Sequence, residues 1–233
     1  ARRLPGGSPL NPLGTSALAA VLLIPLVAAA ILALLPGYRL SARLNVLACG
    51  ASFLAALVLI QQRPAVSDFL FIDDLNIVFL VLNTFIGFTT SVFSASYIRH
   101  ELETGRLTPV YLRFYHAMYQ IMLFGMNLAL AAQNVGVMWV AVELATLTTV
   151  VMVGIYRTHE AIEAAWKYFI LGSVGIALAL FGTILVYLAA QPVIGEGMHA
   201  MSWLLLVANA HRLDPALLNL AFIFLLLGYG TKV

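Results

Sequence analysis

Residues 21–35 read VLLIPLVAAAILALL and residues 217–230 read LLNLAFIFLLLGYG, two apolar runs without a charged side chain. A helix that crosses a bilayer needs about 20 mostly apolar residues. The strands of a membrane β-barrel instead alternate apolar and polar residues over about ten positions, and these runs do not alternate. The sequence therefore predicts membrane-spanning helices.

Stretches of the same kind recur along the chain and predict an all-α fold, a polytopic transmembrane helix bundle with about seven spans. The stretches are residues 16–35, 44–60, 75–98, 114–132, 135–156, 164–189 and 216–233. Two polar side chains are predicted helix N-caps, Asp73 before the third span and Thr158 before the sixth.

The spans divide the chain into three parts. Residues 1–15 form an N-terminal extramembrane segment, residues 16–113 hold spans one to three, and residues 114–233 hold spans four to seven. Within the last part, residues 195–214 have an apolar core that is too short to span, so we expect it at the interface or against the bundle. The first span is interpreted as retained rather than as a signal peptide, because the next span follows closely and no cleavage site is evident.

Composition excludes several classes of protein. Hydrophobic residues make up 62% of the chain and charged residues 9%, with a mean hydropathy of +0.98, whereas soluble domains are about 45–50% apolar and about 25% charged. A net charge of +2 provides no basic face for nucleic acid. Cys49 is the only cysteine, which excludes a disulfide scaffold and disfavours a zinc or iron–sulfur site in this chain.

Basic loop residues predict the orientation, because cytoplasmic loops carry the excess of lysine and arginine. One side has four basic residues, Arg2, Arg3, Arg63 and Arg212. The other side has seven: Arg39, Arg43, Arg99, Arg106, Arg113, Arg157 and Lys167. The loop between spans one and two is therefore predicted to be cytoplasmic and the N-terminus to be outside.

Glu143 is an acidic residue near the middle of the fifth span, in the run VGVMWVAVELATLTTVVMVG. Ionisable side chains at this depth cost at least about 2.5–3.5 kcal/mol on insertion scales, so each is a functional hypothesis. Thr146 lies three residues further on the same helix face. We expect Glu143 to belong to a proton or cation path; the alternative is a buried acid with a structural hydrogen bond.

Lys232 lies well inside the last apolar stretch, after Gly228 and Gly230. Two glycines beside an intramembrane lysine indicate a broken or unwound helix, which lines the ion site in transporters. A buried lysine can accept and release a proton near neutral pH. Equally, the span could end there and let the lysine extend to the membrane surface.

Two other ionisable side chains lie near the ends of spans. Lys167 follows Glu163 by four residues, the favourable order for a helical ion pair that anchors the start of span six. His116, near the start of span four, is either a packed histidine or a member of a relay. No histidine pair for haem, no phosphate-binding glycine loop and no catalytic triad can be assembled from the sequence.

Three longer stretches now carry a resemblance. WVAVELATL (139–147), YRTHEAIEAAWKYFILGSVGIALALFGTILVY (156–187) and LLLGYGTKV (225–233) resemble the antiporter-like subunits of respiratory complex I, Mrp antiporters and membrane-bound hydrogenases. The motifs EAAWKY and GYGTKV are most similar to those of hydrogenase-4 component F. More loosely, Ile72–Asn76 is similar to the family's V-D-G-L-S, with aspartate in place of glycine, and Phe93–Ile98 is similar to Y-S-x-x-Y-M.

The resemblance implies roles for the intramembrane charges. Glu143 matches the family's intramembrane glutamate, Lys232 the lysine of the broken helix, and Lys167 a lysine that would relay protons between them. Together with Thr146 and His116, these residues form the expected proton pathway. We expect the charge on a lysine to stabilise the Glu143 carboxylate, and its loss to favour the protonated acid.

The resemblance also implies a larger assembly. Family members have about fourteen spans in two inverted repeats, so this chain is expected to be the N-terminal part of such a fold, as a fragment or a split subunit. It would be a multi-pass integral protein of a bacterial or archaeal cytoplasmic membrane. There it would conduct protons as a subunit of an oxidoreductase complex. Other membrane subunits would be its partners, with iron–sulfur clusters and flavin or a NiFe centre in partner subunits and no cofactor in this chain. The alternatives are a cation/proton antiporter of the Mrp type and a passive membrane anchor.

Overall fold

The computed structural model describes residues 12–35, 37–107 and 109–232, and these residues form an all-helical bundle. Expectations about residues 1–11, including Arg2 and Arg3 on the predicted outer side, lie outside the described residues. The α-helices are α1 Pro12–Leu34, α2 Tyr38–Gln61, α3 Asp74–Glu103, α4 Pro109–Ala131, α5 Val135–Val153, α6 His159–Ile194, α7 Trp203–Asn209 and α8 Pro215–Gly230. Short 3₁₀ turns occupy Gly154–Tyr156, His199–Met201 and Ala210–Arg212.

Each of the predicted spans is a helix, so the all-α transmembrane fold is confirmed. Within the described ranges, five helical segments are long and apolar enough to cross a membrane: α1, α2, α3, α6, and α5 with the turn that follows it. Helix α4 has 23 residues, and α8 is apolar but has only 16. At about 1.5 Å per residue, α8 is shorter than the hydrocarbon layer.

Polar side chains fix where several helices begin. Asp73 accepts a hydrogen bond of 2.8 Å from the backbone N–H of Asn76 at the start of α3. Thr158 accepts one of 3.2 Å from Ala161 N–H at the start of α6, so both predicted N-caps are confirmed. Asn134 and Asp214 cap α5 and α8 in the same way, although the sequence reasoning had not singled them out.

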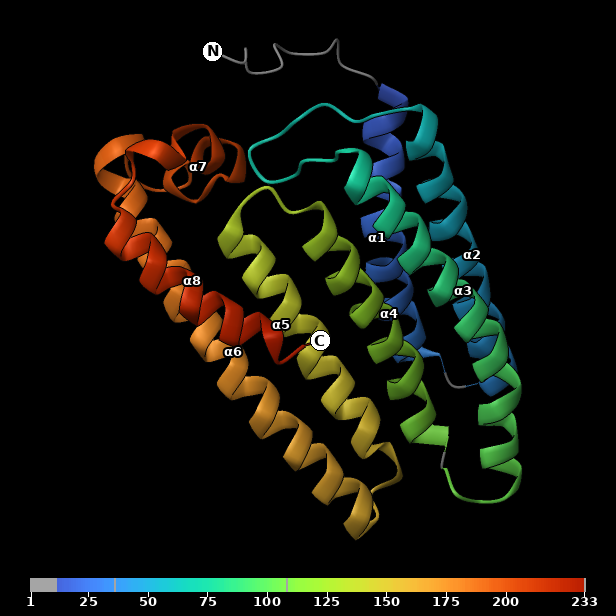
Figure 1. Ribbon diagram of the computed structural model, residues 1–233. Helices are drawn as coiled ribbons and strands as arrows, with labels where there is room; N and C mark the ends of the chain where they lie inside the picture. Colours follow the sequence, from blue (N-terminus) through green and yellow to red (C-terminus); the bar gives the residue numbers. More distant parts are fainter. Residues whose placement is uncertain (1–11, 36, 108, 233) are drawn as a thin grey trace.

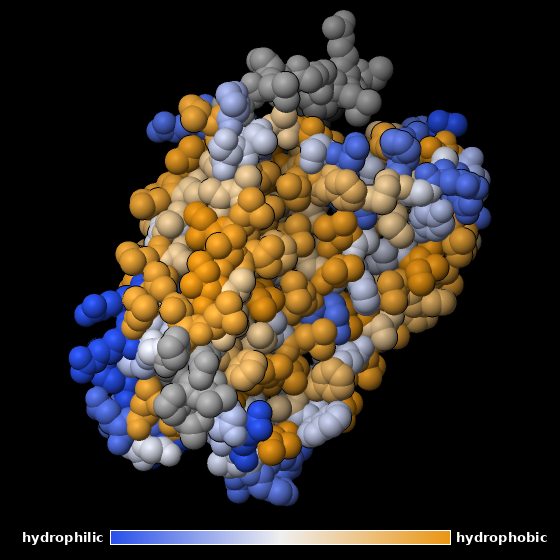
Figure 2. Space-filling model, turned by 180° about the vertical axis from the view of Figure 1, so that it is seen from behind, coloured by the Kyte–Doolittle hydropathy of each residue, from blue (hydrophilic) through white to orange (hydrophobic). Residues whose placement is uncertain are grey.

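The helices form two packed groups. The first group is α1 to α4, the second is α5, α6 and α8, and the groups meet where α4 packs against α5. Helix α1 packs against α2 and α4, α2 against α3, and α6 against both α5 and α8 (Figure 1). The core of the first group includes the fully buried side chains of Val21, Leu59 and Leu80. Orange, hydrophobic residues cover most of the face shown in Figure 2, with hydrophilic residues towards the ends, as a bilayer requires.

Residues 195–214 fold against one end of the bundle, as the sequence predicted for a segment too short to span. Ala200, Leu206 and Leu213 are buried together with Ala190 of α6. The segment is also tied to the α4–α5 connection, because Gln133 Nε2 donates to the hydroxyl of Ser202 at 2.9 Å.

The connections sort the basic residues by end. The α1–α2, α3–α4 and α5–α6 connections lie at one end of the bundle (Figure 1). Arg106 and Arg157 lie on these connections, Arg39 lies at the start of α2, and Arg99 lies near the end of α3. The start of α6 brings Lys167 to the same end. This arrangement agrees with the grouping used for the orientation, and which end faces the cytoplasm stays a prediction.

Helices α6 and α8 approach closely because glycines line their contact. A Cβ atom at position 228 would lie 2.5 Å from the backbone nitrogen of Ala179 and 2.7 Å from the carbonyl oxygen of Gly175. A Cβ atom at position 182 would lie 3.0 Å from the backbone of Ala221. The backbones themselves are in contact, which small residues allow in membrane helix pairs.

The α6–α8 contact gives a direct prediction. Gly228→Leu should force the helices apart and destabilise the protein by roughly 1–3 kcal/mol, the usual cost of overpacking. Gly230→Leu is the matched control, because a Cβ atom at position 230 meets nothing within 4 Å. Thermal unfolding in nanodiscs checks this. Equal melting temperatures for the two variants would contradict the packing.

Candidate functional site

Glu143 lies in the middle of α5, where the sequence placed it. Its side chain is half-buried, and its Oε2 atom is inaccessible and has no hydrogen-bond partner among the described residues. A carboxyl group with an unpartnered oxygen inside a helix bundle needs either a proton or a nearby positive charge. We therefore asked which cation lies near Glu143.

That cation is Lys232, which follows the last residue of α8. Helix α8 is regular through Gly228 and ends at Gly230, two residues before Lys232, and a break in a longer helix at this point stays a prediction. Lys232 does not extend to the surface: its Nζ donates a hydrogen bond of 2.8 Å to Thr146 Oγ1 on α5. The structure thus brings a lysine from α8 to the same face of α5 that carries Glu143.

Thr146 binds the amine of Lys232 on the helix that carries Glu143. Its side chain is buried, and its hydroxyl donates to the carbonyl oxygen of Val142 at 2.9 Å while accepting from Lys232. Glu143 and Lys232 do not form a direct ion pair, because the ion pairs of the described residues are Arg63–Asp74, Arg106–Glu101 and Lys167–Glu163. The amine is held by a neutral hydroxyl one helical turn from the carboxyl.

Two glycines of α6 make room for this arrangement, and the sequence reasoning missed them. A Cβ atom at Gly172 would lie 3.2 Å from Lys232 Nζ and 3.0 Å from Thr146 Cγ2. A Cβ atom at Gly175 would lie 2.8 Å from the Cβ of Thr231. The small-residue spacing in LGSVG was the available sign of a close helix contact.

Trp139 ties α5 to α6 beside the site. Its indole N–H donates to the carbonyl oxygen of Ile176 at 2.8 Å. The bond fixes α5 against the helix whose glycines receive Thr231 and Lys232.

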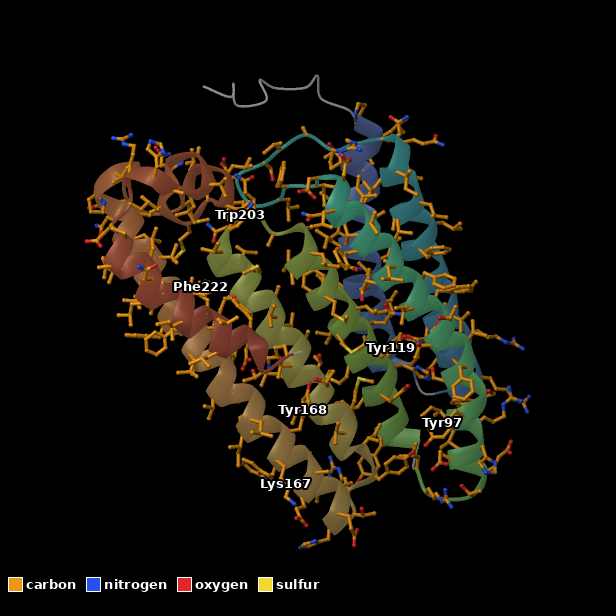
Figure 3. The ribbon with its side chains drawn as sticks, viewed as in Figure 1. Tyr97, Tyr119, Lys167, Tyr168, Trp203 and Phe222 are labelled. Atoms are coloured by element: carbon orange, nitrogen blue, oxygen red, sulfur yellow. The ribbon has the colours of Figure 1, made fainter. Side chains whose placement is uncertain are left out.

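The remaining candidates lie elsewhere. Lys167 is at the start of α6, where Nζ contacts Glu163 Oε1 at 2.5 Å, and the two side chains are 72% and 52% exposed (Figure 3). His116 is fully buried on α4, beside the rings of Tyr38 and Tyr115. Neither residue contacts Glu143 or Lys232, and a relay role for each stays a prediction.

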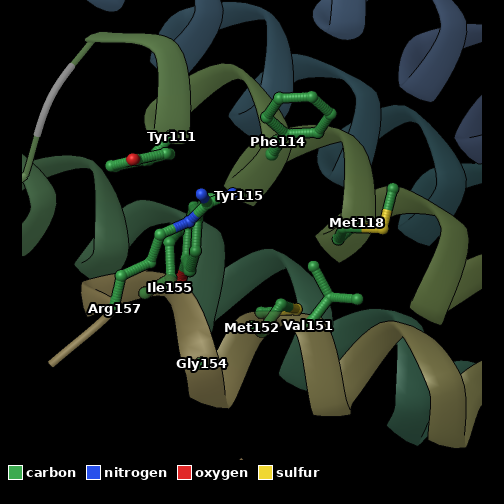
Figure 4. Close-up of a pocket in the computed structure, with 9 residues that line it drawn as sticks. All are labelled: Tyr111, Phe114, Tyr115, Met118, Val151, Met152, Gly154, Ile155 and Arg157. Carbon is green, nitrogen blue, oxygen red and sulfur yellow. The ribbon is translucent and has the colours of Figure 1, made fainter. Parts of the chain in front are cut away.

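Two of the cavities in the described part of the chain have polar side chains in their lining. The first, of about 330 Å³, lies at the arginine-rich end, where the guanidinium of Arg157 is 4.4 Å from the ring centre of Tyr111 (Figure 4). The second, of about 780 Å³, lies between α3, α4 and the α6–α8 region and is lined by Thr183 and Tyr229. Tyr229 is three residues before Lys232, so the second cavity reaches towards the site.

Metal-binding clusters were also sought. Among the residues that the structure describes, no group of three or more His, Cys, Asp or Glu side chains could hold a metal ion.

Comparison with known proteins identifies the relatives of this arrangement. Residues 132–233, which contain Glu143, Thr146 and Lys232, match the NADH:quinone oxidoreductase/Mrp antiporter transmembrane family. The hydrogenase-4 component F homolog of Methylacidiphilum infernorum (isolate V4) is 56% identical over 215 residues, which is 92% of this chain and 45% of that protein. The chain thus spans less than half the length of this curated relative.

Solved structures show the same fold. A chain of the membrane-bound sulfane sulfur reductase, an archaeal respiratory membrane complex, aligns with a TM-score of 0.74 and 17% identity over 91% of this chain and 44% of that chain. A chain of respiratory complex I from Thermus thermophilus aligns with a TM-score of 0.68 and 21% identity over 92% and 43%. The resemblance that the span motifs carried is therefore confirmed.

The bond between Lys232 and Thr146 can be tested by stability. Thr146→Val should remove the acceptor of a half-buried ammonium group and destabilise the fold by roughly 1–3 kcal/mol. Thr146→Ser should keep the bond and most of the stability.

Thr148→Val is the matched control for this prediction. Thr148 is as buried as Thr146, at 5% exposure each, and donates to helix carbonyls without binding Lys232. Unfolding midpoints measured in nanodiscs would decide the matter. A Thr148→Val midpoint as low as that of Thr146→Val would mean that the lysine contributes nothing.

Proposed function

We propose that this chain, which belongs to the antiporter-like membrane subunits related to complex I and membrane-bound hydrogenases, conducts protons across the bilayer. The carrying observation is the placement of Lys232 on Thr146, one helical turn from Glu143. An acid and an amine at membrane depth, close but not in contact, can each stabilise the charged form of the other. A change in the protonation of one group therefore affects the protonation of the other.

The proposed step is a toggle of the two groups. While Lys232 carries its proton, the ammonium group stabilises the carboxylate of Glu143. When Lys232 gives its proton to the next carrier, the half-buried Glu143 carboxylate loses that support and takes up a proton. Transfer of the Glu143 proton to the free amine of Lys232 then restores the carboxylate and the ammonium group. Each cycle therefore moves one proton from the donor to Glu143 to the carrier beyond Lys232, without a net change in either residue.

The energy for this toggle is proposed to come from redox chemistry in partner subunits. The named relatives include a hydrogenase-4 component and subunits of respiratory complexes. Iron–sulfur clusters with flavin or a NiFe centre in such partners would supply the electrons. Other membrane subunits would continue the proton path beyond Lys232.

Replacing the carboxyl tests its role. In the complete complex, Glu143→Gln should abolish proton translocation while the redox reaction and assembly continue, because an amide keeps the shape but cannot release a proton. Glu143→Asp should retain part of the activity. Proton uptake into inverted vesicles, measured per electron transferred, gives the result.

Glu163→Gln is the matched control. Glu163 is also acidic and also interacts with a lysine, but it is exposed and lies away from Thr146. Its variant should translocate protons like the unchanged complex. Full translocation by Glu143→Gln would remove Glu143 from the pathway.

Coupling between Glu143 and Lys232 can be measured with a double-mutant cycle. We expect Glu143→Gln and Lys232→Met to be strongly non-additive in translocation rate, because either change alone already breaks the toggle. The double variant should be no slower than the single variants. Effects that multiply would show two independent residues and would contradict the pair.

A further inference from the structure

The first helix group contains a second set of buried polar side chains, on the face of α4 that packs against α2. His116, Gln120 and Asn127 are each 0% exposed and recur at helical spacing along α4. Asn45 of α2 is equally buried and faces them. Gly125, which contacts α5, lies on the opposite side of α4, so this set is distinct from the Glu143–Lys232 site.

At one end of this set, the buried amide of Asn127 has hydrogen-bond partners within the protein. Asn127 Nδ2 donates to the carbonyl oxygen of Val21 at 3.2 Å, and Asn127 Oδ1 accepts from Asn83 Nδ2 at 2.8 Å. Two helices, α1 and α3, thus supply partners for one amide of α4. Asn127 shows that this bundle can satisfy a fully buried polar group without help.

At the other end, around His116, Gln120 and Asn45, several polar atoms have no hydrogen-bond partner among the described residues. Gln120 Nε2 donates to Asn45 Oδ1 at 2.9 Å and contacts Cys49 Sγ at 3.2 Å. Gln120 Oε1, Asn45 Nδ2, and both ring nitrogens of His116 are buried without a partner among the described residues. The hydroxyl of Ser52, two turns from Asn45 on the same helix, is also buried without a partner among the described residues.

Rotating the amides does not resolve this. If Gln120 and Asn45 were both turned over, they would still pair, and the unpartnered donor and acceptor would only change places between them. The two ring nitrogens of His116 have no partner among the described residues as the ring lies. Its nearest neighbours are the rings of Tyr38 and Tyr115, with centroids at 6.4 and 5.3 Å, which fix the imidazole by packing.

We propose that the α2–α4 interface is a binding site for internal water, held by His116, Gln120 and Asn45. The ligand must both donate and accept, because a neutral imidazole offers one donor and one acceptor and the amide atoms offer one of each kind. It must also be small, because the three side chains are completely enclosed. Water meets both conditions, and immobilising it costs less than leaving such groups unpaired in a membrane.

The direct test is a cryo-EM map of the complete complex in lipid nanodiscs, at a resolution that shows ordered water. We expect water density at hydrogen-bonding distance, about 2.7–3.2 Å, from a ring nitrogen of His116 and from the amide of Gln120. No such density at Asn127 is expected, since its partners are protein atoms. An interface that holds no water density while waters are visible elsewhere in the bundle would overturn the proposal.

A variant pair sharpens the test. His116→Phe keeps a ring between Tyr38 and Tyr115 but removes both nitrogens, so the water bound to the ring should be lost. Tyr119→Phe on the same helix is the matched control: it removes a buried hydrogen bond of 2.7 Å to the carbonyl oxygen of Gly87 on α3 and should leave the water in place. Loss of the density in both variants, or in neither, would contradict the assignment.

Infrared difference spectra provide a second readout in the same samples. Exchange of H₂¹⁶O for H₂¹⁸O should shift a band of strongly held water in the unchanged complex and in Tyr119→Phe, and not in His116→Phe. If His116→Phe fails to assemble, the density map and spectrum of the unchanged complex still decide. Neither readout measures proton translocation, so failure of the Glu143 proposal would leave this test unaffected.

Discussion

In the interior of a membrane no bulk water satisfies polar groups, so each polar side chain in the bundle needs a partner on its own helix or on another one. This constraint accounts for the contacts that hold the helices in register. Asn127 joins α4 to α1 and α3, Gln120 joins α4 to α2, and Trp139 joins α5 to α6. Lys232 joins the end of α8 to α5 through Thr146. Apolar packing gives little preference between registers in lipid, whereas these few bonds each specify one.

The same constraint explains why glycine matters so much on α6. A lysine just past the end of α8 reaches α5 only if α8 lies against the backbone of α6. Gly172, Gly175 and Gly228 allow that approach, because side chains at these positions would meet backbone atoms, Thr231 or Lys232 itself. The site therefore depends on three helices, although only α5 and α8 supply its polar atoms. Substitution of a distant glycine would alter the charge pair as surely as substitution of a neighbour.

Much of the fold could be predicted from the sequence, because apolar length and cap residues are local properties. The spans, the caps at Asp73 and Thr158, and the short segment 195–214 are examples. The depth of Glu143 and Lys232 in apolar stretches was sufficient to select them. Their relation through Thr146 was only partly accessible, since it depends on how closely α8 packs on α6. The partners of Gln120 lie 71 and 75 residues away in the chain, and no local pattern encodes such a pairing.

The hydrogen bond from Lys232 to the neutral hydroxyl of Thr146 also bears on how Lys232 and Glu143 could work together. A direct contact between an ammonium and a carboxylate in a low-dielectric interior holds both charges in place, because separating them exposes each one unpaired. A hydrogen bond from a charged group to a neutral hydroxyl contributes only about 1.5–3 kcal/mol. At about 1.4 kcal/mol per tenfold change, that bond shifts a population by roughly one to two orders of magnitude. Thr146 therefore holds the amine firmly enough to define its position and weakly enough to release it. For a proton relay, this intermediate strength is the useful range, since a carrier that binds its partner too tightly would not turn over.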